Sequence, residues 1–150
     1  MVRTPEVTNR IMSAIKSKNT EPEMLMRKAL WAKGLRYRVN FAKLPGKPDI
    51  VFTRSKVAVF CDGDFWHGHN WVLRGIPSLE EELAQYSEYW RNKILENIRR
   101  DKEENEKLAT DGWFVIRLWE SEIRTNTVKC EEIVERAVRE RLDRRRRVAT

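Results

Sequence analysis

The sequence of 150 residues predicts a single α/β domain with a mixed central β-sheet that helices flank on both faces. Three observations lead to this fold class. Helical and strand patterns follow one another in the order α-α-β-β-β-α-β-α. Apolar residues make up 41% of the chain, which is enough to fill one core. No internal repeat or low-complexity linker divides the sequence into further domains.

Two helices are predicted at the N-terminal end. Residues 4–15 open with Thr-Pro, a typical helix start, and continue with apolar residues at helical spacing. A second helix begins at a capping box, with Thr20 as the N-cap and Glu23 three residues later. Gly34 is placed to end this helix, because glycine readily adopts the left-handed conformation of a C-terminal cap.

A hairpin over residues 44–69 carries the most informative polar residues. Apolar runs at 50–52 and 57–61 predict its two strands. Asp49 stands just inside the first strand, and Asp62, Asp64 and His67 follow the second. Carboxylate oxygens are ligands that Mg²⁺ prefers, and a nearby histidine can accept a proton from water. The hairpin therefore predicts a divalent-metal site.

The C-terminal half is predicted to be mostly helical. We expect a loop at 70–77, then a helical pattern from 78 to 111 with a break near residues 86–87. Residues 113–119 are predicted to form an apolar strand, and residues 127–142 an amphipathic helix. The basic tail at about 143–150, with four consecutive arginines, is expected to be disordered.

Positive charge is concentrated in the first part of the chain. Residues 1–60 carry 13 lysines and arginines against 4 acids, whereas residues 61–150 carry 17 against 19. Residues 35–39 alternate apolar side chains with Arg36 and Arg38, which predicts a strand with one basic face. This distribution suits a polyanion such as DNA or RNA, and a basic surface that merely keeps the protein soluble explains it equally well.

Cysteine content and hydropathy indicate a cytoplasmic protein. Cys61 and Cys130 lie far apart and predict no disulfide framework. No apolar run is long enough to span a membrane, and no signal-peptide pattern opens the chain. We therefore expect a protein of the reducing cytoplasm with no membrane partner.

Each candidate acid also has an ordinary structural explanation. Asp49 could accept backbone hydrogen bonds at a strand start, and Asp62 could belong to a turn. Glu23 could serve only as the helix cap, which the local sequence favours. Asp101 could be a solvated partner of a neighbouring arginine or lysine. The residues themselves leave both interpretations open.

Aromatic residues next to the predicted metal site suggest contact with DNA bases. Phe65 and Trp66 are adjacent, so in an extended chain they point in opposite directions and one is expected to be exposed. An exposed aromatic beside a basic surface can act as a wedge between bases. Trp90 could join it, although a core tryptophan is the simpler interpretation.

The ordered motifs of the chain resemble those of the Vsr endonucleases, the very-short-patch-repair enzymes that nick DNA beside a T:G mismatch. The resemblance extends from Met12 to Ile123. Its motifs are KSKNTxPE (16–23), GLRYRV (34–39), LPGxPDIVF (44–52), VAVFxDGxFWHGH (57–69), EYWxxKIxxN (88–97), RD (100–101) and GWxVIxxWE (112–120). This resemblance implies a restriction-endonuclease-like fold and a Mg²⁺-dependent DNA endonuclease.

Matched position by position, the resemblance assigns roles to the candidate residues. Asp49 takes the place of the central Mg²⁺ ligand, and Cys61 supplies a backbone carbonyl to the metal. His67 matches the histidine that activates the attacking water. Glu23 and Asp101 match acids that organise water around the metal. Asp62 matches the Asp-Gly of many members and is a further catalytic candidate, and Phe65, Trp66 and Trp90 match intercalating aromatics. Independently of the resemblance, their charge makes Lys16, Lys18, Arg36 and Arg38 candidate DNA-binding residues.

The sequence departs from the family pattern at its structural zinc. Family members typically hold this zinc with three cysteines and one histidine, and the matching positions here are Asp64, His69, Trp71 and Ser121. One histidine cannot complete a tetrahedral zinc site. We expect no structural zinc, and expect packing around Trp71 and Trp119 to replace it.

The resulting hypothesis is a cytoplasmic, nucleoid-associated endonuclease that acts as a monomer on double-stranded DNA. Two alternatives remain open at this stage. The first is a homing or restriction-type endonuclease that cleaves matched duplex. The second is a DNA-binding module without catalytic activity, which the retained set of Glu23, Asp49, His67 and Asp101 disfavours.

The basic residues generate a first testable prediction. If Lys16, Lys18, Arg36 and Arg38 help to neutralise roughly five phosphates, the logarithm of affinity should fall with a slope of about −4 to −5 against the logarithm of salt concentration. Fluorescence anisotropy with labelled duplexes measures this slope. Removing the charges should weaken binding to all sequences alike. Affinity that stays flat up to physiological salt would contradict the assignment.

Overall fold

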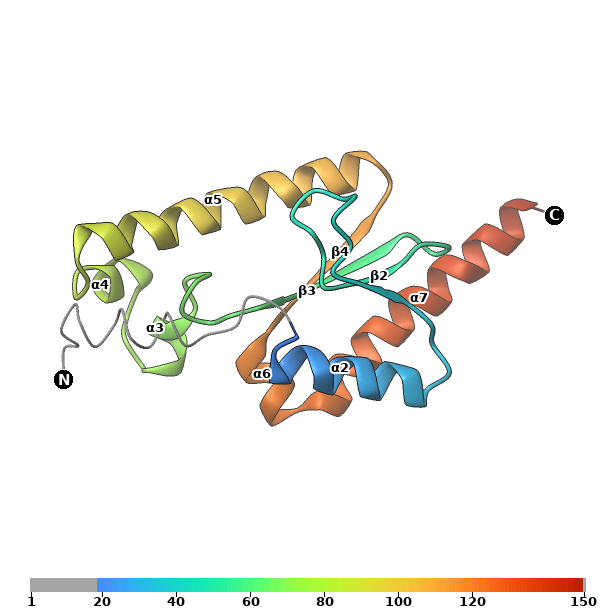
Figure 1. Ribbon diagram of the computed structural model, residues 1–150, viewed down its shortest axis with the longest axis horizontal. Coiled ribbons are helices and arrows are strands. Elements are labelled where there is room, and N and C mark those ends of the chain that lie inside the picture. The colour runs from blue at the N-terminus through green and yellow to red at the C-terminus, as the bar shows by residue number, and fades with distance from the viewer. Residues whose placement is uncertain (1–18, 150) are drawn as a thin grey trace.

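A mixed four-stranded sheet between two layers of helices forms the centre of the protein (Figure 1). The computed structural model describes residues 19–149. The strands lie in the order β1, β2, β3, β4, with antiparallel pairing along the first three and parallel pairing between β3 and β4. Their bounds are Arg38–Val39 (β1), Ile50–Phe52 (β2), Val57–Asp62 (β3) and Phe114–Trp119 (β4).

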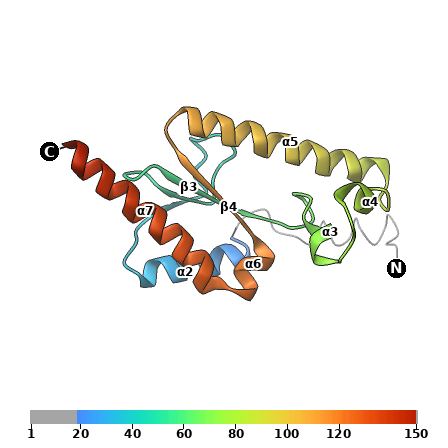
Figure 2. The same ribbon diagram turned by 180° about the vertical axis from the view of Figure 1, so that it is seen from behind.

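Helices cover both faces of the sheet, as the sequence predicted (Figures 1 and 2). The long helix α5 (Glu88–Thr110) crosses one face and contacts β4. Three helices pack together on the other face, and they are α2 (Glu21–Ala32), α6 (Glu120–Thr125) and α7 (Thr127–Ala149). Two short helices, α3 (Asn70–Leu73) and α4 (Leu79–Leu83), precede α5.

Alternation along the strands separates an apolar face from a polar one. Val59, Cys61 and Leu118 belong to the main core, together with buried residues of α2, α6 and α7. Neighbouring positions on the same strands point to the opposite face, toward α5. That face carries Asp62 on β3 and Arg117 on β4. The sheet therefore supplies charged groups beneath α5 without placing them in the main core.

The predicted caps of α2 are confirmed. The Thr20 hydroxyl accepts a hydrogen bond from the Glu23 backbone N–H at 3.4 Å. At the other end, Gly34 has a φ of 83°, and the backbone N–H of Leu35 donates to the carbonyl of Leu30 at 3.1 Å. This left-handed cap closes the helix and returns the chain toward the sheet.

The predicted interruption before α5 is also confirmed. The hydroxyl of Ser78 accepts a hydrogen bond from the Glu81 N–H at 3.1 Å and caps α4. The hydroxyl of Ser87 accepts one from the Trp90 N–H at 3.5 Å and caps α5. Two serine caps in succession explain why the helical pattern is divided, because each supplies an acceptor for a free N–H of a new first turn.

The segments at residues 35–39 and 70–77 differ from the prediction. The strand expected over residues 35–39 is reduced to the two residues of β1. Arg36 turns back onto α2, where its guanidinium lies 3.5 Å from the Trp31 ring centroid and donates to the Trp31 carbonyl at 3.1 Å. The expected loop at 70–77 contains the helical turn α3.

The C-terminal helix is longer than predicted. It continues past Leu142 to Ala149, through the four consecutive arginines. The Arg141 side chain donates to the carbonyls of Ser55 at 2.7 Å and Gly112 at 2.6 Å, and Arg145 donates to the carbonyl of Arg54. These contacts hold this part of α7 against the end of the sheet.

Some predictions lie outside the described residues. The helix expected over residues 4–15 and the lysines Lys16 and Lys18 precede residue 19, where the described chain begins. Within residues 19–149, no helix combines the length and the apolar character needed to cross a membrane.

Asp64, His69 and Ser121, which the resemblance matches to zinc-ligand positions, form a polar clasp together with Trp119. The carboxylate of Asp64 accepts hydrogen bonds from the Ser121 N–H at 3.0 Å and the Ser121 hydroxyl at 2.7 Å. The His69 ring stacks on Trp119, with the ring centroids 4.1 Å apart. The clasp forms because Ser121 lies in the first turn of α6, whose N-cap Trp119 offers no side-chain acceptor. The residue stacked on Trp119 is His69.

The clasp generates a stability prediction. Asp64→Ala leaves the Ser121 N–H and hydroxyl without their acceptor, and should lower the free energy of unfolding by about 1–3 kcal/mol in urea titrations. The matched control is Asp143→Ala on the exposed surface of α7. This substitution should change the free energy of unfolding by less than about 0.5 kcal/mol.

A separate measurement tests the expected lack of structural zinc. Elemental analysis of protein purified without chelator should find no stoichiometric zinc, and a chelator should leave the melting temperature unchanged. Stoichiometric zinc whose removal lowers the melting temperature would contradict this prediction.

Candidate active site

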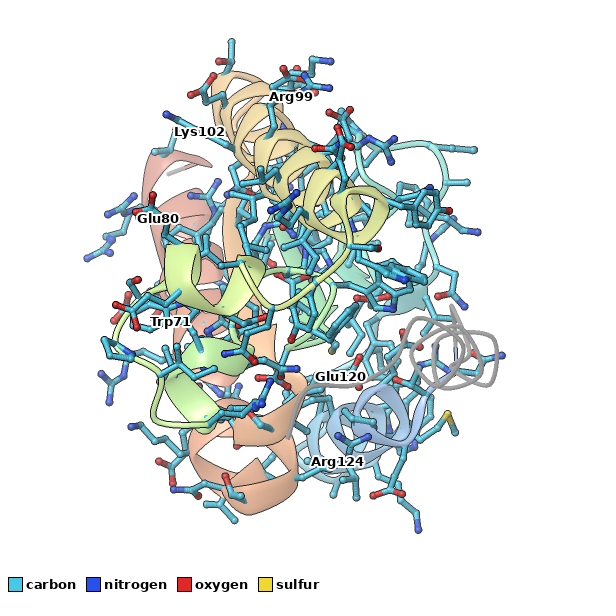
Figure 3. The ribbon with its side chains drawn as sticks, turned by 90° about the vertical axis from the view of Figure 1, so that its left-hand side faces the viewer. Trp71, Glu80, Arg99, Lys102, Glu120 and Arg124 are labelled. Carbon is cyan, nitrogen blue, oxygen red and sulfur yellow. The ribbon has the colours of Figure 1, made fainter. Side chains whose placement is uncertain are left out.

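A cleft of about 480 Å³ opens where the hairpin ends meet α2 and α5. Residues from α2, the hairpin, α5, β4 and α6 line it, so segments far apart in the sequence meet at one place. Figure 3, which looks at the molecule from the left-hand side of Figure 1, labels Glu120, a lining residue at the start of α6. The acidic lining residues are Glu23, Asp49, Asp62, Asp101, Glu104 and Glu120.

Asp49 lies at the start of β2, next to the end of β3. Its carboxylate accepts a hydrogen bond from the Cys61 N–H at 2.6 Å. Burial, together with the neighbouring charges of Glu23 and Asp62, raises the pKa of Asp49 to about 8, although the Cys61 hydrogen bond opposes the shift. A buried carboxylate without a positive partner is costly to ionise, and a cation held beside it removes this cost.

Glu23 stabilises the start of α2 and also lines the cleft. Its carboxylate accepts a hydrogen bond from the Asn19 N–H at 2.6 Å and pairs with Arg27 at 3.4 Å. The residue is only 2% exposed, yet it lines the cleft next to Asp49. The capping contact therefore orients the carboxylate at the cleft wall and does not exclude a catalytic role.

The oxygen donors on the Asp49 side of the cleft fit a hard divalent cation. Asp49 and Glu23 offer carboxylate oxygens side by side, which is the ligand chemistry of Mg²⁺. The Cys61 side chain belongs to the main core, and burial raises the pKa of its thiol well above the usual value. A neutral buried thiol is not a ligand, so only the backbone of Cys61 could contribute to a metal site.

His67 is held by an acid on each side. Its Nδ1 is hydrogen-bonded to Asp101 on α5, and its Nε2 lies 3.8 Å from Asp62. Burial favours the neutral imidazole, but the Asp101 hydrogen bond and the charges of both acids outweigh it and raise the pKa of His67. An imidazole oriented through Nδ1 leaves Nε2 to exchange a proton, as a general base requires.

Sequence reasoning missed Arg117, which lies at the centre of the second group of acids. Its guanidinium is 3.1 Å from Asp62, 3.2 Å from Asp101 and 3.3 Å from Glu104. The segment containing it was interpreted as an apolar strand. The available signal was the arginine itself, because a lone charge within a buried strand needs an acidic partner.

A second metal-binding arrangement is geometrically possible. Asp62, His67 and Asp101 offer ligand atoms within 4.8 Å of one another, and they are the only such group of three or more within residues 19–149. Arg117 pairs with two of its members. Asp49 does not belong to this group, so the predicted acids divide into two neighbouring sets.

The aromatic residues are arranged differently from the prediction. Phe65 and Trp90 are both buried in a small apolar cluster, and Trp66 packs against it half-buried. The rings of Phe65 and Trp66 lie 5.7 Å apart, because residues 64–68 form a turn in place of an extended strand. Asn97 donates to the carbonyl of Trp66 at 3.1 Å and fixes this turn. Of the three aromatic residues, only Trp66 lines the cleft.

The cations near the cleft also differ from those predicted. Arg36 and Arg38 are exposed on the surface and do not line it. Lys47 and Arg100, which the sequence analysis did not select, are lining residues. Lys47 offers a positive charge to a phosphate backbone that enters the cleft, whereas Arg100 also pairs with Glu96 at 3.4 Å.

Comparison with known proteins assigns this arrangement to a family. A family model described as DNA mismatch endonuclease Vsr matches residues 2–73. The chain is 46% identical over 138 residues to the type II nicking enzyme V.NmeDIP of Neisseria meningitidis serogroup C, with 92% of this chain and 90% of that protein covered. It is 40% identical over 139 residues to the type II nicking enzyme V.HpaIIP of Haemophilus parainfluenzae, with coverage of 92% and 95%.

A relative with the family name gives the same result. The chain is 34% identical over 132 residues to the DNA mismatch endonuclease Vsr of Escherichia coli (strain K12), covering 88% of this chain and 78% of that protein. An alignment of this length includes the hairpin, α5 and β4, which line much of the cleft. This protein is therefore a DNA endonuclease of the restriction-endonuclease-like fold, and it belongs to the Vsr family of DNA mismatch endonucleases.

Proposed function

We propose that this protein is a Mg²⁺-dependent endonuclease that hydrolyses a phosphodiester bond of double-stranded DNA beside a T:G mismatch. The observation that carries the proposal is the convergence of Asp49, Glu23, His67 and Asp101 in one cleft, from three separate parts of the chain. The formal charge of +7 also supports a DNA substrate. With such a substrate, the proposed location is cytoplasmic and nucleoid-associated.

The proposed chemistry divides between the two sets of acids. Asp49, with Glu23 beside it and the Cys61 backbone, would hold the metal. When bound, Mg²⁺ polarises the phosphate and stabilises negative charge on the leaving 3′-oxygen. His67 takes a proton from the attacking water through Nε2. Asp101 holds the Nδ1 side of the ring and stabilises the imidazolium that results.

Mismatch recognition is proposed for the aromatic side of the cleft. Trp66 lies next to His67 and lines the cleft, which supports a contact between its ring and a base near the scissile phosphate. Phe65 and Trp90 support Trp66 from behind through edge-to-face contacts at 5.7 and 5.5 Å. Wedge insertion by Phe65 or Trp90 would first require the apolar cluster to open.

A cleavage assay tests both the activity and its substrate. With Mg²⁺, the protein should nick a T:G-mismatched duplex and leave the matched duplex intact. Asp49→Asn should lower the nicking rate by several orders of magnitude, because the metal loses its charged ligand. The DNA affinity of the same variant should remain within about threefold of the wild type, since the Asp49 carboxylate contacts the protein's own backbone and not a DNA phosphate.

Two outcomes would overturn parts of this proposal. Equal cleavage of matched and mismatched duplexes would favour a restriction-type activity and remove the mismatch assignment. Full nicking by Asp49→Asn would remove Asp49 from the metal site.

Glu23→Gln separates capping from catalysis. Glutamine keeps an oxygen that can accept the Asn19 N–H bond, so the melting temperature should stay the same. The charge beside Asp49 is lost, so the nicking rate should fall by roughly 10- to 100-fold. His67→Ala serves as the reference for a lost general base, with a decrease of about 10²- to 10⁴-fold. Full activity of Glu23→Gln would return Glu23 to a purely structural role.

A further inference from the structure

The cleft contains two sets of carboxylates that differ in how their charge is balanced. The aspartate half consists of Asp49 and Glu23, and the arginine half consists of Asp62, Asp101 and Glu104 around Arg117. Both are clustered acids of the kind that can hold divalent ions. The difference between them determines where an ion can bind.

Arg117 fills the arginine half with a fixed positive charge. One terminal nitrogen lies 3.1 and 3.2 Å from the two oxygens of Asp62, and the other lies 3.3 Å from Glu104. Its Nε donates to Asn105 at 2.7 Å. Every guanidinium nitrogen therefore has a partner, and the group cannot move aside without breaking several contacts at once.

The surroundings of Arg117 reinforce this position. Its guanidinium carbon lies 4.0 Å from the ring centroid of Phe60, its neighbour across the parallel strands. The side chain is only 17% exposed, and a guanidinium does not lose its proton in a protein. The positive charge is consequently permanent, largely shielded from water and rigidly directed at Asp62 and Asp101.

The aspartate half has no comparable charge. Within residues 19–149, no lysine, arginine or histidine forms an ion pair with Asp49, whose polar partners are the Cys61 N–H and Glu23. Glu23 shares its charge with Arg27 at 3.4 Å. Asp49 is thus the acid of the cleft that still needs a cation.

We propose that Arg117 takes the place of a second metal ion, so that the protein binds a single divalent ion in the aspartate half and none among Asp62, His67 and Asp101. This inference rests on the proposed function and specifies the metal content of its site. A divalent ion in the arginine half would lie beside the guanidinium, and the oxygens it needs already accept hydrogen bonds from Arg117.

The same contacts make Arg117 a positioning residue for His67. Arg117 pairs with Oδ1 of Asp101, which leaves Oδ2 of Asp101 to hold Nδ1 of His67. Nε2 is then the imidazole atom that faces Asp62 and the cleft. The arginine therefore balances the charge of the arginine half and sets the direction of the imidazole.

Metal stoichiometry tests the proposal without reference to cleavage. Mn²⁺ binding to the full chain, without DNA, is measured by isothermal titration calorimetry and by the electron paramagnetic resonance of free Mn²⁺. The wild type should bind a single ion, which Asp49→Asn removes. Arg117→Gln should bind an additional ion, because it frees Asp62 and Asp101 and removes the repelling charge. The matched control is Arg99→Gln, an exposed arginine on the outer side of α5 (Figure 3), which should bind like the wild type.

A second variant keeps the test decisive if Arg117→Gln does not fold. Asp62→Asn should still bind a single Mn²⁺, because Asp62 is a partner of Arg117 and not a metal ligand. Two ions in the wild type, one of which is lost in Asp62→Asn, would overturn the proposal. Unchanged stoichiometry in a folded Arg117→Gln protein would overturn it as well.

Kinetics provide a separate readout for positioning. Arg117→Gln should lower the single-turnover nicking rate by roughly 10- to 100-fold with DNA affinity unchanged, and Arg117→Lys should recover part of the rate because it restores the charge. A nicking rate of Arg117→Lys no higher than that of Arg117→Gln would contradict the charge argument. Failure of the proposed function is distinguishable, because it would appear as cleavage that persists in Asp49→Asn whatever the number of ions bound.

Discussion

The antiparallel pairing of β2 with β3 is the constraint on which the site depends. The pairing aligns Ile50 with Val59, which brings Asp49 at the start of one strand next to Cys61 and Asp62 at the end of the other. The hydrogen bond from the Cys61 N–H to Asp49 fastens this junction. A shift of one residue would turn the buried side chains of the hairpin toward the opposite face. The apolar core that fixes the register therefore also fixes the acids.

A second layer of organisation comes from α5 and β4. The parallel pairing of β3 with β4 places Arg117 beside Phe60, and α5 lies over this face with Asp101 and Glu104 directed at the guanidinium. One cation thereby connects two strands and a helix through their acidic groups. Because Asp101 also holds His67, the packing of α5 on the sheet bears directly on the direction of the imidazole.

The polar clasp joins the two segments that follow β3 and β4. Asp64 accepts the free N–H of the first turn of α6 and the hydroxyl of Ser121, so it connects the segment after β3 to the segment after β4. The stacked pair of His69 and Trp119 reinforces the same junction. These hydrogen bonds need one carboxylate and one serine that the fold brings together, whereas a zinc site needs four correctly placed ligands.

The sequence by itself determined the elements and most of the candidate acids, because caps, strand runs and turn residues are local signals. Thr20, Ser78 and Gly34 fixed helix ends, and Asp49 and His67 stood out within the hairpin. Only the tertiary structure decided the partners. Nothing local to Arg117 identifies Asp62 or Asp101, and the turn that buries Phe65 depends on packing against α5. Ion pairs and aromatic clusters join residues that are distant in the chain, so their pairing follows from the fold.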